Sequence, residues 1–534
     1  MARWFVDRPS RRGIHSVSLR RVLPEGRFVG ALDWKVTGCT DDHRRLEPGQ
    51  VFVATRHEHT GYDGHSFVGE ALERGAAGVI VERPSEAAGR LQVVVKDGSV
   101  AFARICQALA GDPSRKLAVL GVAGLAGRTL AGLFLRSILS AAGERAGLIG
   151  ALGFHDGSTS RPLGAGFEPK GDALRRGERI LGPREGFSPS PAAVSALLAE
   201  LAENGCSGGI LEAPTEALER KAFTAIDLHA VLVTDVQVPR GYPAECVIDE
   251  RRSMARLIRQ VVPGGLVVVN ADDANAELLG GVNLTTRRVA FSLESPGSRP
   301  DVDVHARVTH QDAAGIRLVI QGFDRPGLVH LPLIAPRAAS AAAAAAALAW
   351  ALEIKLDAVV TGLESVRSLA GSLERVDQGQ DFDVRVDAAT TPDALREALT
   401  TLRAVAPGRV HCVFASEGGG DRLERRALAD AVESHADRVI ITTSNPRHED
   451  PNQILDDLLA GFHHPGKVRV EPDRQTAIES TLAHAQPGDV VLIAGKGRQA
   501  YQIFANRVVP FDDHVVVNEW LRGHRRPEKT QRSA

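Results

Sequence analysis

The sequence predicts an α/β protein built from three α/β units in series. Short apolar runs of strand length alternate with helical stretches along most of the 534 residues. Many of these runs are continuously apolar, which is typical of parallel strands covered by helices on both faces. Near the start of the second unit, a glycine-rich stretch, GVAGLAGRTLAGL over residues 121–133, joins an apolar run to a helical pattern.

The first unit is assigned to residues 1–112. We expect its strands at 50–54, 76–82 and 91–95, and a helix at 66–76. The second unit, residues 113–368, has more elements. Its expected parallel strands cover 116–124, 207–213, 230–236, 265–273 and 289–293. Alternation over 302–320 predicts an antiparallel hairpin, and the alanine-rich run 338–352 predicts a packed helix.

The third unit is assigned to residues 369–524. Its expected strands cover 409–415, 437–443 and 489–495, and its expected helices cover 391–405 and 452–462. The last ten residues, 525–534, are polar and basic, and we expect a flexible tail.

Composition excludes several classes of protein. The chain has 64 basic and 66 acidic residues, so no overall field would attract nucleic acid or an anionic membrane. We expect no membrane span, because no window reaches the roughly 18 uninterrupted apolar residues that a span needs. The five cysteines are scattered and form no C-x-x-C pair. This usage favours a reducing cytoplasm and no structural zinc site.

The glycine-rich stretch has the outline of a phosphate-binding loop. Such a loop needs inward-facing N–H groups, a cation for the phosphates and a hydroxyl for magnesium. Gly121, Gly124, Gly127 and Thr129 fit the backbone and hydroxyl roles. Arg128 stands at the lysine position; it keeps the charge but brings a longer, planar and directional group. The alternative, a tight strand-to-helix turn that binds no nucleotide, stays open.

Motifs along the chain, from about Asp33 to Leu521, resemble those of the Mur ligase family, in the branch that adds the third residue to UDP-N-acetylmuramoyl-dipeptide. They are TDDHRRLEPGQVFVA, GYDGHSFVGEALERGAAGVIVE, LAVLGVAGLAGRT, ILEAPTEAL, LVVVNADD, GSLERV, DAATTPDAL, GGGDR, SNPRHEDP and AGKGRQAYQ, in that order. Each motif alone is weak, but their order and spacing together indicate the family.

The resemblance implies a three-domain architecture: a uridine-nucleotide-binding domain, a central P-loop-type ATPase domain and a C-terminal domain of dinucleotide-fold type. It also implies ATP and Mg²⁺ as cofactors and amide formation through an acyl phosphate. The ligands would be a UDP-N-acetylmuramoyl-peptide and a small amino acid or diamino acid. Protein partners leave no mark in the sequence.

The resemblance also assigns site residues. Arg128 and Asp387 would be catalytic, and Thr129 and Glu212 would bind the metal. The residues expected at ATP are Gly121, Gly124, Gly127, Arg128 and Thr129. The residues expected at the substrates are Asp42, Arg44, Asp63, His65, Arg422, Asn445, Arg447 and Gly495. For Asp42 and Asp63, a plain role as helix cap or turn residue remains open.

Most of the positions that differ from the family pattern are those expected to handle magnesium and the γ-phosphate of ATP. Arg128 replaces the loop lysine, Met254 replaces a carbamylated lysine, and Thr390 replaces a histidine. Pro239 and Arg240 stand where the family has aspartate and histidine. In the third unit, Ser444 and Gln499 replace the two carboxylates expected to hold the distal ammonium of diaminopimelate. We therefore expect a family member with impaired catalysis that binds ligands or acts as a scaffold; the alternative is an active, unconventional ligase.

Overall fold

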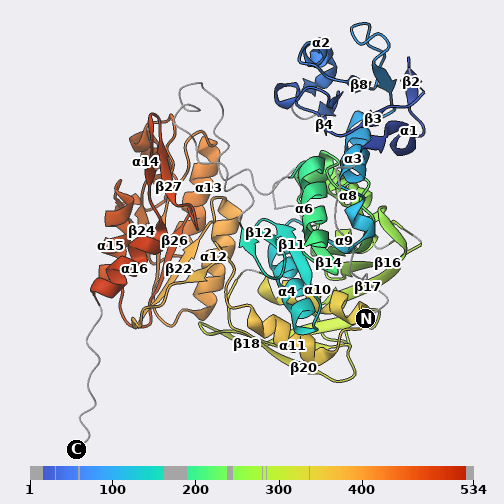
Figure 1. Ribbon diagram of the computed structural model, residues 1–534. Helices are drawn as coiled ribbons and strands as arrows, with labels where there is room; N and C mark the ends of the chain where they lie inside the picture. The colour runs from blue at the N-terminus through green and yellow to red at the C-terminus, as the bar shows by residue number, and fades with distance from the viewer. Residues whose placement is uncertain are drawn as a thin grey trace, which may run out of the picture.

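The computed structural model describes residues 16–30, 32–57, 61–161, 189–236, 244–279, 281–283, 285–335 and 337–524. Three larger sheets, of five, eleven and six strands, organise these residues. Figure 1 shows the three sheets as separate bodies, with the eleven-stranded sheet between the other two. The predicted α/β class is confirmed. The predicted tail, 525–534, lies outside the described residues.

The N-terminal sheet has five strands and is parallel except at one edge. Its order is β2 (Arg27–Val29), β9 (Gln92–Val94), β8 (Gly78–Val81), β5 (Val51–Val53), β4 (Cys39–Thr40), with β2 antiparallel to β9. Helices α2 (Val68–Glu73) and α3 (Gly98–Leu109) pack against it. The strands expected in this unit are confirmed. Helix α3 reaches the central unit, where Gln107 Nε2 donates to Ser195 Oγ at 2.9 Å.

The central sheet has eleven strands and a parallel middle. Its order is β13 (Ser160–Arg161), β12 (Gly153–His155), β11 (Ala146–Gly150), β14 (Gly208–Glu212), β10 (Ala118–Ala123), β15 (Leu228–Val233), β16 (Val261–Asn270), β17 (Arg287–Ser292), β18 (Val304–Asp312), β19 (Gly315–Gln321), β20 (Gly327–Leu331). The strands from β11 to β18 are parallel. Strands β18 and β19 form the predicted antiparallel hairpin. The antiparallel edge of β11, β12 and β13 was not among the predicted strands.

Helices cover both faces of the middle of the central sheet, which is why β10 and β14 are buried along their whole length. One apolar core holds side chains of α4 (Arg128–Ala141), α10 (Ala338–Ala351) and α11 (Leu356–Ser365). The other holds side chains of α6 (Pro191–Glu203), α7 (Thr215–Glu219), α8 (Ala244–Ile258) and α9 (Ala274–Leu279). All six residues of β10 are buried between them. The alanine-rich helix α10 confirms the prediction, and its small side chains let it lie deep in the core.

The C-terminal sheet has six strands and is parallel except for β21. Its order is β21 (Glu374–Arg375), β22 (Asp383–Asp387), β26 (Val490–Ala494), β23 (Val410–Phe414), β24 (Arg438–Ile441), β25 (Val468–Val470). Its helices are α12 (Pro392–Val405), α13 (Arg422–Glu433), α14 (Pro451–Leu459), α15 (Arg474–His484) and α16 (Asp513–Gly523). A hairpin of β27 (Tyr501–Phe504) and β28 (Arg507–Pro510) was not predicted. The expected strands and helices of this unit are confirmed.

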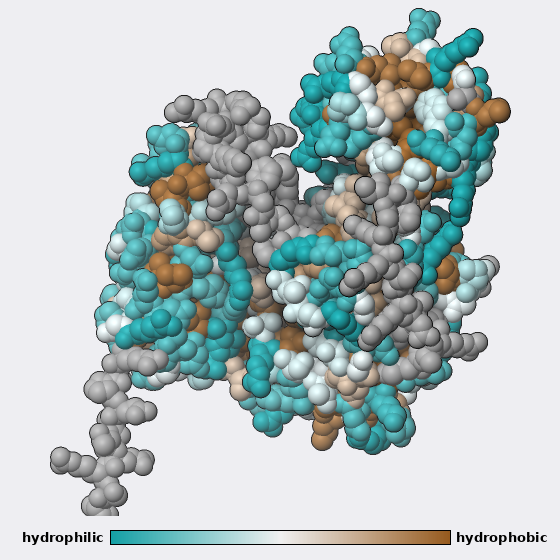
Figure 2. Space-filling model, in the orientation of Figure 1, coloured by the Kyte–Doolittle hydropathy of each residue, from teal (hydrophilic) through white to brown (hydrophobic). Residues whose placement is uncertain are grey.

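Polar residues cover most of the visible surface (Figure 2). The most exposed large apolar side chains, Leu32, Leu328 and Leu423, come from three different units of the chain. Among the described residues, no helix is long and apolar enough to cross a membrane.

Helices α4 and α11 cross so closely that only glycine fits at residue 362. A Cβ there would lie 2.4 Å from Ile138 Cα. We expect Gly362→Ala to lower the free energy of unfolding by about 1–3 kcal/mol, because backbone atoms must move to admit the methyl group. Urea unfolding followed by circular dichroism measures this change. The matched control is Gly69→Ala in α2, where a Cβ meets nothing within 4 Å; it should stabilise by up to about 1 kcal/mol. Equal effects at the two positions would contradict the account of the crossing.

Candidate functional site

The glycine-rich loop leaves the carboxyl end of β10 and enters α4. Gly124 (φ 134°) and Gly127 (φ 73°) have left-handed backbone conformations that side chains rarely adopt. A Cβ on Gly124 would also lie 2.0 Å from Thr234 Oγ1. Gly121 differs, since it lies within β10 and a Cβ there would make only ordinary contacts. The structure therefore has the strand, tight turn and helix of a phosphate-binding loop.

A carboxylate of the chain binds the amides of this loop. Asp235 Oδ1 accepts hydrogen bonds from the N–H groups of Leu125 at 2.8 Å and Ala126 at 3.0 Å. Asp235 is 3% exposed and follows β15, the neighbour of β10. Burial raises the pKa of this carboxyl, while the two amides and Arg337 act in the opposite direction. In a phosphate-binding loop, such N–H groups point at the anionic ligand; here they hold Asp235.

Arg128 and Thr129, the cation and the hydroxyl of the loop, are both paired with Glu212. Glu212 ends β14, on the other side of β10, and its side chain is 3% exposed. Its Oε1 accepts from Thr129 Oγ1 at 2.5 Å and from Arg128 Nε at 2.9 Å, and its Oε2 accepts from Ala151 N at 2.7 Å. Arg128 Nη1 donates to Gly124 O at 2.6 Å. The planar fork of Arg128 therefore lies against the loop rather than along the path a lysine would follow.

The groups that ATP and magnesium would need are paired within the chain in this structure. Two loop amides hold a carboxylate, and Glu212 already accepts three hydrogen bonds. Met254 is 1% exposed in an apolar core and is a poor ligand for a hard cation. No three His, Cys, Asp or Glu side chains converge into a metal-binding arrangement in the described part of the chain. Pro239 and Arg240 lie outside the described residues.

Asp387 faces the loop across a cavity of about 240 Å³ that α12 and Arg337 also line. It ends β22 and accepts from the N–H groups of Leu373 and Ala389, both at 2.7 Å. Burial raises the pKa of Asp387 to about 6. Arg337 bridges this cavity, because its Nη1 contacts Asp235 at 2.6 Å and its Nε contacts Glu397 of α12 at 3.0 Å.

Three of the predicted substrate residues meet at the carboxyl ends of β24 and β26. Gly495 N donates to Asp387 O at 3.0 Å. Asn445 Nδ2 donates to Glu417 Oε1 at 3.0 Å, and Arg447 Nη2 donates to Glu417 Oε2 at 3.2 Å. Glu417 is 5% exposed. Burial lowers the pKa of the neighbouring Lys496 to about 8. Parallel sheets of this kind bind ligands at their carboxyl edge, so the cluster is well placed for one.

Arg422 is not part of that cluster. Its side chain is 68% exposed and its Nε lies 3.3 Å from Asp457. The buried arginine of α13 is instead Arg425, 1% exposed, which contacts Glu449 and Asp457 at 2.7 and 2.9 Å.

The predicted uridine-nucleotide residues serve as caps in the structure. Asp42 caps a short helix and its Oδ1 accepts from the Nε of Arg44 at 2.9 Å. Asp63 caps the next short helix, and His65 Nδ1 lies 2.7 Å from its Oδ1. Each carboxylate thus has the cap role that the sequence left open. The side chains of Asp42 and Asp63 are nevertheless 24% and 30% exposed, so both also reach the surface.

Comparison with known proteins decides the family. Residues 373–497 match the family model described as Mur ligase, glutamate ligase domain. The chain is 31% identical to a UDP-N-acetylmuramyl-tripeptide synthetase of Roseiflexus sp. (strain RS-1), over 90% of this chain and 93% of that protein. The chain belongs to the Mur ligase family.

Other members of the family align with more than nine-tenths of this chain. A UDP-N-acetylmuramoyl-L-alanyl-D-glutamate–2,6-diaminopimelate ligase of Alkalilimnicola ehrlichii is 32% identical over 92% of this chain and 96% of that protein. A solved structure of a ligase with the same name has a TM-score of 0.67 at 24% identity, covering 96% of this chain and all of the other. The structural likeness shows the Mur ligase fold.

Three residues of this Mur ligase site were missed from the sequence: Asp235, Arg337 and Glu417. Asp235 directly follows a buried strand next to the loop strand, and this position is the signal that could have identified it. Glu417 carries a similar signal, since it lies three residues after the buried strand β23. Arg337 carries none, because it meets its partners only through contacts between distant segments.

The pKa of Asp387 makes stability depend on pH. Because folding raises this pKa, the folded state holds the proton more tightly than the unfolded state. The contribution is therefore present near pH 4 and is lost as pH rises through about 6. We expect the unfolding free energy of the wild type, relative to Asp387→Asn, to fall by up to about 3 kcal/mol between pH 4 and pH 7. Urea unfolding at several pH values measures it.

The matched control is Asp393→Asn, at a half-exposed acid in the first turn of α12. It separates the effect of the buried carboxyl from the effect of removing one negative charge. A flat difference between wild type and Asp387→Asn would contradict the assignment.

Proposed function

We propose that this Mur ligase homologue binds a UDP-N-acetylmuramoyl-peptide of peptidoglycan precursor synthesis and has impaired or absent ligase chemistry, so that it acts as a ligand-binding or scaffolding protein. The observation that carries the proposal is the internal pairing of the loop. Asp235 holds two loop amides, and Arg128 and Thr129 hold Glu212.

Electrostatics supports this proposal. A triphosphate at the loop would meet the carboxylate of Asp235 on the same N–H groups, and two anions cannot share them without strong repulsion. Arg337 would lose one of its two acidic partners if Asp235 moved away. Removing one donor from a site that stabilises a transition state costs roughly 2.7–4 kcal/mol, and this loop has several groups committed elsewhere at once.

A small amino acid or diamino acid is the proposed second ligand, at the cluster of Asn445, Arg447 and Gly495. Glu417 already accepts from Asn445 and Arg447, which makes it the acid nearest to the proposed ligand. Ser444 and Gln499 stand where the resemblance implies carboxylates, so diaminopimelate is disfavoured. Arg422, exposed at the start of α13, remains the proposed contact for the ligand's carboxylate.

An active but unconventional ligase is the second candidate. It is favoured by relatives that are named as ligases and that align along nine-tenths of the chain. Asp387 and Arg422 are also retained. For either candidate we propose the units 1–112, 113–368 and 369–524 as the uridine-nucleotide, ATPase-like and C-terminal domains, and a cytoplasmic location.

Ligand-dependent thermal unfolding tests the proposal. We expect UDP-N-acetylmuramoyl-dipeptide to stabilise the protein, by about 2.7 kcal/mol at one hundred times its dissociation constant. We expect ATP with Mg²⁺ to leave the melting temperature unchanged, because the loop amides hold Asp235. Product formation at ordinary turnover, in a ligation assay with a panel of amino acids, would rule out the non-catalytic proposal. Absence of stabilisation by any UDP-muramoyl-peptide would rule out the binding role.

A variant of the glycine-rich loop tests whether the internal pairing is what prevents ATP binding. Asp235→Asn combined with Arg128→Lys removes the competing charge and restores a compact cation, so we expect measurable ATP–Mg²⁺ binding by calorimetry that the wild type lacks. The matched control is Asp156→Asn, at a buried acid that also accepts two backbone hydrogen bonds, from Ser158 and Thr159. ATP binding to the wild type as strong as to the double variant would show that the internal pairing is no barrier.

A further inference from the structure

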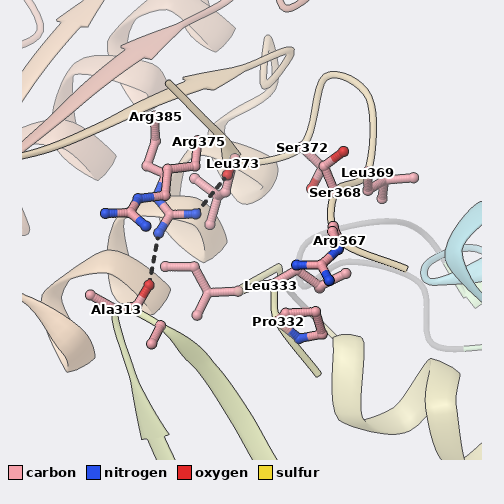
Figure 3. Close-up of a pocket in the computed structure, with 12 residues that line it drawn as sticks. Ala313, Pro332, Leu333, Arg367, Ser368, Leu369, Ser372, Leu373, Arg375 and Arg385 are labelled. Atoms are coloured by element: carbon pink, nitrogen blue, oxygen red, sulfur yellow. Dashed lines mark hydrogen bonds between the residues drawn. The ribbon is translucent and has the colours of Figure 1, made fainter. Parts of the chain in front are cut away.

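A second cavity, which shares Leu369 and Ser372 with the cavity beside the loop, lies at the junction of the central and C-terminal sheets. It has a volume of about 80 Å³, several times the roughly 10–15 Å³ that one water requires. Its walls come from the turn between β18 and β19, the segment that follows β20, the linker that precedes β21, and strands β21 and β22 (Figure 3). No acidic side chain is among the residues that line it.

Three arginines line this cavity, and we call them the junction arginines: Arg367, Arg375 and Arg385. Figure 3 shows Arg375 and Arg385 together on one side and Arg367 on the opposite side. Arg385 is 3% exposed and donates to Asp383, to Leu373 O at 3.2 Å and to Ala313 O at 3.1 Å. These hydrogen bonds fix the plane of a buried guanidinium beside the cavity.

The junction arginines carry more charge than their acidic partners neutralise. Asp383 contacts both Arg375, at 3.2 Å, and Arg385, at 2.7 Å. Asp377 contacts Arg375 at 3.2 Å. Arg367 is exposed and has no hydrogen-bond or ion-pair partner among the residues that the structure describes. Three positive charges therefore meet two negative ones, and the excess positive charge lies at the cavity.

We propose that this cavity binds a phosphate group, either inorganic phosphate or the phosphate of a monoester. Guanidinium forks bind tetrahedral oxyanions through paired N–H groups. The hydroxyls of Ser368 and Ser372 line the same cavity and supply two more donors. A phosphate has four oxygens for three guanidinium groups and two hydroxyls, whereas a carboxylate has only two. The bound anion would join the linker before β21 to the β18–β19 turn.

Binding of inorganic phosphate to the full chain tests the proposal. Calorimetry with sodium phosphate, against sodium chloride at equal ionic strength, should detect binding to the wild type. We expect Arg367→Gln to weaken it by at least about tenfold, as for a lost charge-assisted hydrogen bond. Two variants should leave it unchanged: Arg90→Gln, at an exposed arginine before β9, and Arg128→Gln in the loop. Phosphate binding that survives Arg367→Gln, or that is lost in Arg128→Gln, would overturn the proposal.

A second titration, with glycerol 3-phosphate, distinguishes binding of a phosphate monoester from binding of free phosphate alone. Equal affinity for both anions indicates that the cavity accepts a monoester, and binding of inorganic phosphate alone restricts the ligand to the free ion. Crystals of the wild type soaked in selenate give an independent reading from the anomalous signal of selenium. A peak between the junction arginines supports the proposal. A peak only at the glycine-rich loop, or none, contradicts it.

Discussion

The pairing of β10 between β14 and β15 is the constraint on which the candidate site depends. Register places Val122 opposite Glu212 and Ala123 opposite Val233, so the loop, Glu212 and Asp235 leave the sheet at the same edge. A one-residue slip in either neighbour would carry its acid away from the loop. The two apolar cores that enclose β10 hold this register. The loop's chemistry is thus set by strand pairing as much as by the residues of the loop itself.

Internal charge compensation recurs at every cluster of the candidate site. Arg128 pairs with Glu212, Arg337 with Asp235, and Arg447 with Glu417. Each pair includes an acid that is 5% exposed or less at its side chain, so its charge is neutralised by the arginine rather than by solvent. A ligand anion must therefore compete with an acid already in place. The junction cavity differs, because its third arginine has no such acid.

Much of the fold could be predicted because buried parallel strands leave continuous apolar runs, and the runs at 207–213 and 489–495 became β14 and β26. Strand β11 was not predicted, although it has the same length as β14 and the same number of glycines. The site was predictable where residues follow one another along the chain, as in the loop. Asp235, Arg337 and Glu417 were not found, since their roles arise from contacts between segments up to 110 residues apart. The family motifs identified candidate site residues along the chain, but they could not identify the residues that pair with them.

Arg337 contacts an acid of the central unit and an acid of α12 at once. A rearrangement that carries α12 away would remove Glu397 and leave Arg337, at the start of α10, beside Asp235, so it would strengthen the hold of that acid on the loop. Linkage makes the effect reciprocal: displacement of Asp235 from the amides would strengthen the attachment of α12 by the same free energy. The glycine-rich loop and the C-terminal unit are therefore coupled through Arg337, and a change at one alters the stability of the other.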